Sequence, residues 1–572
     1  MGLKLASTIS ITFLFALVYA IVFAISILFL PYTPLSLIIV IGFTVLIIAF
    51  QYLISPYIIQ WIYRIDWIEY EDFARQFPHL HEAVQKVVDV YGIQTPRIGF
   101  IHDGNPNAFT FGHTKNNARI VITDGILQYL DENEQKAVLA HELGHVIHND
   151  FILMTVVFAI PLILLTIARW AYYAVRFSGR GSKDEGSYII LALLAIAVLS
   201  YIAYWIGYLV SLFISRIREY YADEHSAELT RNPNYLSTAL VKIAYGILAV
   251  ENEAQIYEKK SSKVNALKGL GIFDPKKASY LAIESYNGSK PIVKEQIQAA
   301  AGWDLFNPWA KYFQMFSTHP LPARRIQRLN EQCEEYNVPI EIDFSQARQI
   351  KEEQVGKSMI GKFLTDIIVK KLPAIIFWMF VLITIASILA IIGLIPIVPS
   401  LLSLITVKNF VFLWFIAFYM MGFATILRTV FMYRRGFEPK KVIDLVTQIN
   451  VSPVRPIPAI IEGTIVGKGI PGYYFGEDLF FQDDTGLLYV DYRFGLRIVD
   501  FFWAITRADQ QVGKKVRIRG WYRRGANPYI QIDRLEVIGE RTYKNHSKLM
   551  MYILAGVLFL IGLGILYFWF LI

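Results

Sequence analysis

Two histidines and a glutamate in the segment His141-Glu142-Leu143-Gly144-His145 form an H-E-x-x-H motif. In a helix of about 3.6 residues per turn, His141 and His145 lie one turn apart on the same face, so both imidazoles can reach one metal ion. Glu142 follows the first histidine on the open side of that metal, where a carboxylate can take a proton from a metal-bound water. Two histidine ligands and a glutamate base in this arrangement need a third protein ligand from elsewhere. A surface helix whose polar residues match by chance is the alternative interpretation.

The residues around the motif predict the helix that carries it. Asp131 can cap the N-terminus of this helix, and the residue types at 132–140 are compatible with a helical conformation. We expect the helix to run straight on from the motif into an apolar stretch, residues 151–175. The motif would therefore lie near a membrane surface.

A pair of carboxylates follows a later apolar run. Glu219 and Asp223 are four residues apart and share one helical face. A carboxylate can be the third ligand of a zinc site with two histidines, which leaves the fourth position for water. Asp223 could accept the other ring N–H of a ligand histidine and fix its tautomer. A charged, exposed helix start would contain the same residues, but both groups adjoin membrane spans and an even number of crossings places them on the same side.

Two further segments could reach the same site. His319 and Arg325 belong to a proline-containing loop that opens a helix, and they could stabilise the oxyanion of a tetrahedral intermediate. Residues 105–112 lie between two predicted strands, 97–101 and 118–122. A strand there could present its free edge to an extended peptide. A plain hairpin with a Pro/Asn turn explains the segment equally well.

The composition indicates an integral membrane protein. Of the 572 residues, 55% are hydrophobic, and they are concentrated in long uncharged runs. The net charge of +8 is explained by cytoplasmic Lys and Arg that face anionic lipid, an interpretation we favour over nucleic-acid binding. The single cysteine, Cys333, excludes an intramolecular disulfide and a thiolate-rich metal site. Histidine and carboxylate must then hold the metal, which suits zinc.

The apolar runs predict seven membrane spans. Lys4 and Arg64 flank the first pair of spans and indicate that both its ends are cytoplasmic, so that seven crossings leave the carboxyl end outside. The run at 372–405 exceeds one span and is interpreted as a span, a turn and the start of the return. The predicted spans are 7–30, 35–55, 151–175, 188–214, the first part of 372–405, 409–427 and 548–572.

Residues 433–547 differ in character from the rest of the chain. Alternating β-branched and aromatic residues with Gly and Asp turns predict several strands and a small β-barrel, for which an OB-like barrel is a candidate. The basic and aromatic strand 514–524 would suit single-stranded nucleic acid. A solvated strand that faces lipid headgroups is the interpretation we favour.

The histidine motif, the segment Glu219 to Asp223 and the segment Ser317 to Pro320 occur in one order that resembles the HtpX-type membrane zinc metalloproteases and their relatives, the CAAX prenyl endoproteases. The resemblance covers about residues 7–330, and the chain departs from the family plan after about residue 371. It implies a gluzincin-type zinc endopeptidase at the cytoplasmic face. It further implies one Zn²⁺ per chain with the ligands His141, His145 and Glu219, with Glu142 as base, Asp223 behind the ligands, His319 and Arg325 near the substrate, and a substrate-binding edge strand at Asn107, Ala108 and Phe109.

We therefore expect a multi-pass α-helical protein of the cell membrane, with a mainly α catalytic domain that carries a small β-sheet, and a small C-terminal β-barrel. Catalytic and β-rich parts would be cytoplasmic. The expected units are a transmembrane hairpin (1–55), a protease domain including two spans (56–371), a transmembrane pair (372–432), the β-rich domain (433–547) and a last span (548–572).

The expected function is quality-control proteolysis of unfolded or membrane proteins. A processing protease for one dedicated substrate, such as a prenylated C-terminal peptide, is an alternative, and so is a non-catalytic membrane scaffold with a partner-binding β-domain. Expected partners are a peptide or protein substrate and membrane lipid, with no nucleic acid. A protein partner at the β-rich domain is left open.

Overall fold

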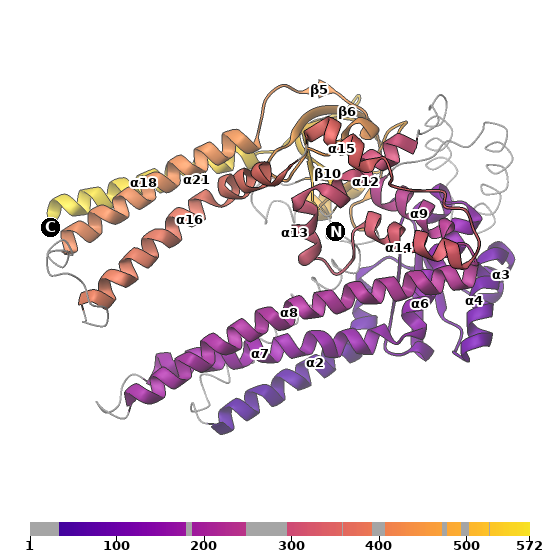
Figure 1. The fold of residues 1–572 in the computed structure, drawn as a ribbon, viewed down its shortest axis with the longest axis horizontal. Helices are drawn as coiled ribbons and strands as arrows, with labels where there is room; N and C mark the ends of the chain where they lie inside the picture. The colour runs from indigo at the N-terminus through magenta and orange to yellow at the C-terminus, as the bar shows by residue number, and fades with distance from the viewer. Residues whose placement is uncertain are drawn as a thin grey trace.

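The computed structural model describes residues 34–178, 186–246, 294–356, 358–391, 406–471, 477–492, 503–525 and 527–572. Two bundles of long helices leave the same side of a body made of shorter helices and two β-sheets (Figure 1). The first bundle is formed by α2 (Pro34–Ile62), α7 (Asp150–Ser178) and α8 (Gly186–Thr230), and the second by α16 (Ile360–Ile391), α18 (Val407–Met432) and α21 (Ser547–Leu571).

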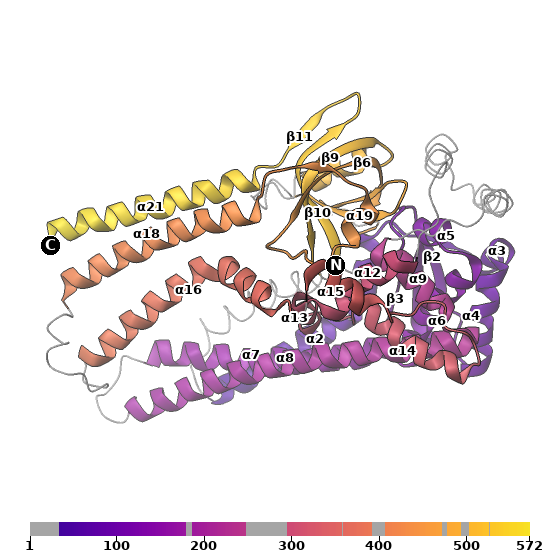
Figure 2. The same cartoon turned by 45° about the horizontal axis from the view of Figure 1, so that its top comes forward.

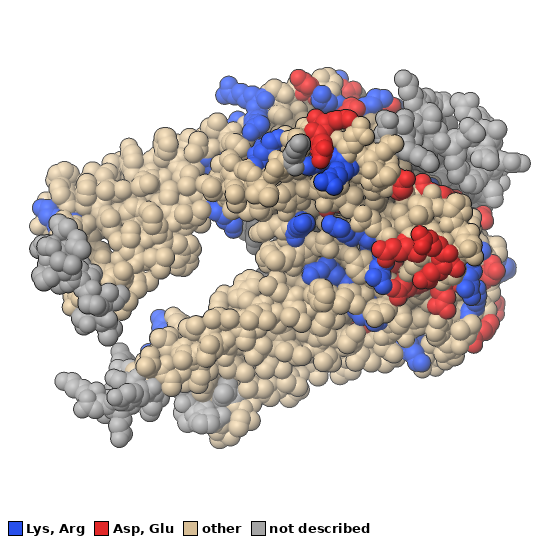
Figure 3. Space-filling view, in the orientation of Figure 1, with Lys and Arg blue, Asp and Glu red and all other residues tan. Residues whose placement is uncertain are grey.

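Each of these six helices is long and apolar enough to cross a membrane. They account for six of the seven predicted spans, whereas the predicted span 7–30 and residues 392–405 lie outside the described residues. Figure 3 shows the charged side chains gathered on the body, while the bundles are uncharged along most of their length in this view. The protein is thus a multi-pass membrane protein, as the composition predicted.

Helix α8 joins the membrane to the body. It contains 45 residues, and at about 1.5 Å per residue it is roughly 68 Å long, far more than a bilayer requires. Its first part belongs to the membrane bundle and its last turns lie in the body (Figure 1). Glu219 and Asp223, in the last part of the helix, are both buried. One continuous helix therefore connects the membrane span to the carboxylates that the sequence singled out.

The first half of the body is mainly helical and carries a four-stranded sheet in the order β1-β2-β4-β3. Strands β2 and β4 are parallel, and β3 is antiparallel to β4 at the end of the sheet. The plain hairpin considered for residues 105–112 is therefore wrong, because parallel neighbours cannot be joined by a tight turn. The strands are β1 (Asp66–Ile68), β2 (Arg97–Ile101), β3 (Ala108–Gly112) and β4 (Ala118–Thr123).

The α-helices of this half contribute to one hydrophobic core that continues into the second half of the body, whereas the short 3-10 turn η1 (Lys115–Asn117) buries no residue. The α-helices are α3 (Tyr70–Gln76), α4 (Pro78–Tyr91), α5 (Asp124–Tyr129), α6 (Glu132–Ile147), α9 (Asn234–Tyr245), α12 (Lys294–Phe306), α13 (Pro308–Met315), α14 (Pro322–Glu335) and α15 (Ala347–Val355).

Helix α6, which carries the histidine motif, begins as the sequence predicts. The Asp131 side chain accepts hydrogen bonds from the backbone N–H groups of Asn133 and Glu134, and the Glu134 carboxylate accepts one from the backbone N–H of Asp131, so a complete capping box is present. The expectation that α6 runs straight into the apolar stretch is wrong. The helix ends at Ile147, and Asn149 adopts a left-handed conformation with φ 54° before α7 begins. Asparagine tolerates this conformation better than most residues, so it allows the chain to turn between the two helices.

The second half of the body is a β-barrel, as predicted. The pairings close on themselves in the order β6-β7-β8-β10-β9-β6, with β8 and β10 parallel and the other pairs antiparallel. The strands are β5 (Glu438–Pro439), β6 (Ile457–Lys468), β7 (Leu479–Gln482), β8 (Leu487–Asp491), β9 (Lys515–Arg524), β10 (Pro528–Val537) and β11 (Thr542–Lys544), with α19 (Val442–Val446), η2 (Ala504–Ala508) and η3 (Asp509–Gln511) beside them.

The barrel packs directly against the helical half (Figure 2). Trp303 of α12 donates its Nε1–H to the carbonyl of Val451 at 2.8 Å. Arg524 of β9 is only 2% exposed and donates to the carbonyls of Val446 and Ala300. Arg523 is equally buried. The expectation that strand 514–524 is solvated and faces lipid headgroups is thus wrong for its last two arginines, which are buried and hydrogen-bonded inside the protein.

Candidate metal centre

Three side chains converge where α6 crosses the end of α8. The Nε2 atom of His141 lies 3.7 Å from Glu219 Oε2, and the Nε2 atom of His145 lies 3.6 Å from Glu219 Oε1. One ligand atom from each of the three residues lies within 4.8 Å of the other two, and all three side chains are buried. A single cation between them could therefore contact one carboxylate and two imidazoles.

Gly144 allows the two helices to approach closely enough for this convergence. A Cβ at Gly144 would lie 2.9 Å from the Cα of Ala222, closer than real side chains come. The glycine inside the histidine motif thus brings α6 and α8 together. This is a packing role that the motif alone does not reveal.

The far side of each histidine is held by a carboxylate. His141 Nδ1 lies 3.0 Å from Asp223 Oδ1, and His145 Nδ1 lies 2.6 Å from Asp150 Oδ2. Arg218 in turn donates its Nε–H to Asp150 Oδ1 at 2.6 Å. The Nδ1–H of His145 donates to Asp150, so that ring directs the lone pair of its Nε2 toward Glu219. The Nδ1 atom of His141 lies between Asp223 and the Nη2 atom of Arg325, which is 3.3 Å away. Two neutral imidazoles and one carboxylate are a donor set that zinc prefers, so the residues fit this metal.

Asp150 was not singled out from the sequence. Its position five residues after His145 only weakly indicates a contact with that histidine, because Asp150 faces His145 only as a result of the turn at Asn149. Asp223, by contrast, lies where its helical spacing to Glu219 predicted it.

The electrostatics of the centre favour a positive charge. Burial and the guanidinium of Arg325 oppose a charge on His141, but the neighbouring carboxylates of Asp223 and Glu219 outweigh them and raise its pKa above the ordinary value. Burial also acts against Arg325, yet Asp223 and Glu219 raise the pKa of that guanidinium further. Because the carboxylates stabilise cations here, the cluster is suited to hold a metal ion.

The structure brings Arg325 to the site through Asp223. Its Nε donates to Asp223 Oδ2 at 2.9 Å, and its Nη1 lies 3.8 Å from Glu219 Oε2. The guanidinium therefore holds in place the carboxylate of Asp223, which faces His141. This contact belongs to α14, whose first turn contains Arg325.

Glu142 lies beside the ligands and contacts the edge strand. Thr110 of β3 donates its hydroxyl to Glu142 Oε2 at 2.7 Å. The glutamate is 5% exposed. Sequence reasoning missed Thr110, although it belongs to the segment 105–112 that was considered as a substrate strand.

His319 occupies the most open position of the group. Its Nδ1 lies 2.8 Å from Glu219 Oε2, and its side chain is 30% exposed, whereas the ligands are almost fully buried. Arg216 of α8 fixes the loop before it by donating Nη1–H bonds to the carbonyls of Gln314 and Ser317, both at 2.9 Å. Arg216 was also missed, since it lies about a hundred residues away in the sequence.

The predicted substrate strand is an edge strand. The backbone N–H of Thr123 donates to the carbonyl of Asn107 at 3.0 Å, so the backbone of Asn107 faces β4. Backbone groups alternate along an antiparallel strand, so those of Ala108 and Thr110 point away from β4, to an edge that no other described strand covers. The side chain of Phe109 is 4% exposed and packs into a small core with Tyr63.

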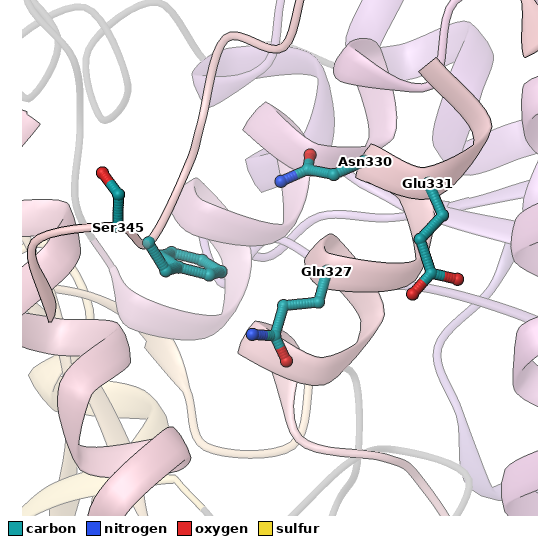
Figure 4. A pocket seen from close by; sticks show the side chains of 5 residues that line it. Gln327, Asn330, Glu331 and Ser345 are labelled. Atoms are coloured by element: carbon teal, nitrogen blue, oxygen red, sulfur yellow. The ribbon is translucent and has the colours of Figure 1, made fainter. Parts of the chain in front are cut away.

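One further depression lies elsewhere on the body. It is lined by polar side chains of α14 and by the segment before α15, and it contains none of the site residues described above (Figure 4). Its lining residues are Gln327, Asn330, Glu331, Phe344 and Ser345.

The part of the chain that contains the site is similar to known proteins. Residues 74–333 match peptidase family M48. The protease HtpX homolog of Methanothermobacter thermautotrophicus is 38% identical over 249 residues, which make up 44% of this chain and 88% of that protein. The protease HtpX homolog of Sulfurihydrogenibium sp. is 31% identical over 282 residues, 49% of this chain and 82% of that protein. The crystal structure of S. mikatae Ste24p has a TM-score of 0.35 and 17% identity over 57% of this chain and 65% of that chain.

Proposed function

The chain belongs to peptidase family M48, as its resemblance to HtpX-type proteases predicted, and on this premise we propose that this membrane metalloprotease is a zinc endopeptidase that cleaves unfolded or membrane proteins at the cytoplasmic face of the cell membrane. The observation that carries the proposal is the convergence of two histidines and a carboxylate beside Glu142 and the free edge of β3.

The ligands in this proposal are His141, His145 and Glu219, which would hold one zinc ion per chain. When bound, zinc would polarise the scissile carbonyl and lower the pKa of water at the site. Asp223 and Asp150 support the ligands because their hydrogen bonds fix the tautomers of the two histidines.

The remaining residues handle protons and charge. Glu142 accepts a proton from the attacking water and then transfers it to the nitrogen of the leaving amine. Thr110 holds the carboxylate of Glu142 at the edge strand. His319, the most open side chain of the group, is placed to stabilise negative charge on the carbonyl oxygen of the substrate.

The substrate class follows from the edge strand. A peptide that pairs with the free backbone groups of Ala108 and Thr110 is held mainly by main-chain hydrogen bonds. Such binding asks little of the peptide sequence but requires an extended conformation. This requirement favours unfolded segments, as in protein quality control.

The orientation in the membrane, the type of barrel and the class of partner also belong to the proposal. The amino end would be cytoplasmic, with the protease half and the barrel on the same side. The barrel would be OB-like, which is supported by its five strands closing in the order β6-β7-β8-β10-β9. Nucleic acid would not be a partner, because Arg517 pairs with Glu462 and Arg519 with Asp533 on the basic strand.

The test compares the native protein with Glu142→Gln, both purified at full length in detergent. We expect about one zinc per chain in both proteins, and chelator-sensitive cleavage of unfolded casein that falls about 100- to 10,000-fold in the variant. Glu132→Gln is the matched control, because Glu132 is an exposed residue on the first turn of the same helix. A Glu142→Gln protein that still cleaves at the native rate would remove Glu142 from the role of base.

Processing of a dedicated prenylated substrate is the alternative that needs an enclosed chamber in the membrane. Figure 3 shows the two helix bundles standing apart, with an open space between them. Cleavage of a prenylated peptide but not of casein by the zinc-loaded protein would favour this alternative. Zinc binding without cleavage of either, together with capture of a partner by the barrel, would favour the scaffold.

A further inference from the structure

The barrel is hydrogen-bonded to the loop that leads into the edge strand β3. At the end of β6, the backbone N–H of Lys468 donates to Asp103 Oδ2 at 3.0 Å. The backbone N–H of Gly104 donates to the carbonyl of Val466 at 3.1 Å. The side-chain amide of Asn105 donates to the carbonyl of Lys468 at 3.1 Å. We call these contacts between residues 103–105 and residues 466–469 the clamp.

The clamp is built for close approach of two backbones. A Cβ on Gly467 would overlap Asp103 Oδ1, and a Cβ on Gly104 would overlap the carbonyl of Val466. Asn105 is only 2% exposed. Glycine on both sides and a buried amide between them distinguish the clamp from an incidental contact of two surfaces.

The clamped loop continues directly into β3. The carbonyl of Asn105 accepts the hydroxyl of Thr123 at 2.8 Å, and the same hydroxyl oxygen accepts the N–H of Asn107 at 2.8 Å. Strand β3 begins at the next residue, Ala108. A displacement of the loop would therefore be passed to the start of the strand.

The other end of β3 is attached to the membrane bundle. His113, the residue after the strand, is hydrogen-bonded through Nε2 to the carbonyl of Leu53 in α2 at 2.8 Å. Tyr52 of α2 donates its hydroxyl to the carbonyl of His113. The edge strand is thus held between a membrane helix and the barrel, and Thr110 lies midway, beside Glu142.

We propose that the barrel is a positioning element for the substrate strand: the clamp fixes the start of β3, the strand whose middle contacts Glu142, so that barrel residues 466–469 set the affinity for an extended peptide without taking part in the chemistry. This inference rests on the proposed function, in which β3 binds the substrate. It assigns a role to a part of the chain outside residues 74–333, the part that matches the family.

The clamp acts on binding rather than on the metal centre. The ligands belong to α6 and α8, whose contact through Gly144 does not involve the barrel. Releasing one end of a pre-ordered strand adds the cost of ordering it to each binding event, and we expect peptide affinity to fall about 10-fold.

The experiment weakens the clamp from both sides in the full-length, zinc-loaded protein. Gly467→Val introduces a steric clash from the barrel, and Asn105→Ala removes the amide donor without a clash. Arg517→Gln is the matched control, since Arg517 forms an exposed ion pair with Glu462 elsewhere on the barrel. Should Gly467→Val fail to accumulate, Asn105→Ala decides alone.

Binding is measured separately from cleavage. The three substitutions are combined with Glu142→Gln, and the Kd of a fluorescent, unfolded casein peptide is read by anisotropy, with zinc content determined in the same samples. In proteins that retain Glu142, KM and kcat are measured with casein. We expect Kd and KM to rise about 10-fold in both clamp variants, with kcat within about 2-fold, unchanged zinc, and native values in the control.

The outcomes separate this inference from the proposed function. If the native protein binds the peptide but does not cleave casein, and the clamp variants bind more weakly, the inference stands while the proteolytic function fails. An unchanged Kd in both variants overturns the inference, and so does a native protein that binds no peptide. A fall in kcat accompanied by loss of zinc also overturns it, because the barrel would then support the fold of the metal centre instead.

Discussion

Replacing Asp150 with asparagine should weaken metal binding, although Asp150 is not a ligand. Its carboxylate accepts from His145 Nδ1 with one oxygen and from Arg218 Nε with the other, both at 2.6 Å. Asparagine keeps the shape but has one acceptor oxygen and one NH2 group. Whichever way the amide is turned, an N–H faces another N–H, so either His145 or Arg218 loses its acceptor.

The size of the effect follows from this geometry. Removing the outer partner of a ligand histidine typically costs about 10- to 100-fold in metal affinity, which corresponds to about 1.4 to 2.8 kcal/mol. We expect Asp150→Asn near the lower end, because one orientation of the amide still accepts from His145. Asp150→Ala should lie near the upper end, because no acceptor remains.

The assay is competition for zinc between the purified protein and a chromophoric chelator at constant pH. Glu224→Gln is the matched control, since Glu224 lies on α8 one residue after Asp223 but pairs with Arg328 at the surface. An exposed ion pair contributes little, so the control should change the zinc affinity less than about 2-fold. If Asp150→Asn also bound zinc within 2-fold of the native protein, the carboxylate would not be what orients His145.

Two further predictions concern packing and pH. Gly144→Val should separate α6 from α8, because a Cβ there would lie 2.9 Å from Ala222 Cα. We expect loss of zinc and a destabilisation of about 1–3 kcal/mol in thermal unfolding. A variant with native zinc content would contradict this prediction. Burial raises the pKa of Asp103 from 3.8 to about 7, against the backbone hydrogen bonds that lower it. Its protonated form therefore stabilises the fold below about pH 4, and this contribution is lost as the pH rises toward 7, by about 1.4 kcal/mol per pH unit. Asparagine cannot ionise, so in thermal unfolding the stability of Asp103→Asn relative to that of the native protein should be higher at pH 8 than at pH 5. A stability difference that does not change with pH would refute the raised pKa of Asp103.

Much of the metal centre could be predicted because it is encoded locally. The four-residue spacing of His141 and His145, and that of Glu219 and Asp223, fixes each pair on one helical face wherever the helix lies. Asp131 caps α6 through contacts within three residues. The single cysteine restricts the ligand types before any fold is known.

The partners of those residues could not be predicted in the same way. Thr110 meets Glu142 across 32 positions of the chain, and Arg325 meets Asp223 across 102. Asp150 faces His145 only because Asn149 turns the chain between two helices. Each of these contacts depends on how elements pack, and hydrophobic periodicity records only which face of an element is buried.

The sequence by itself predicted the six membrane-length helices that the structure describes, the barrel and the residue types of the candidate metal centre, because hydrophobicity, strand alternation and residue chemistry are properties of short segments. Tertiary structure alone decided that Arg523 and Arg524 are buried instead of facing lipid, and that residues 466–469 hold the loop before β3. The sequence around a charged residue or a glycine does not fix whether that residue is buried or which segment it contacts, because both depend on another part of the chain. The physical reason is that burial and close backbone approach belong to pairs of elements, and the chain brings those pairs together only in the folded protein.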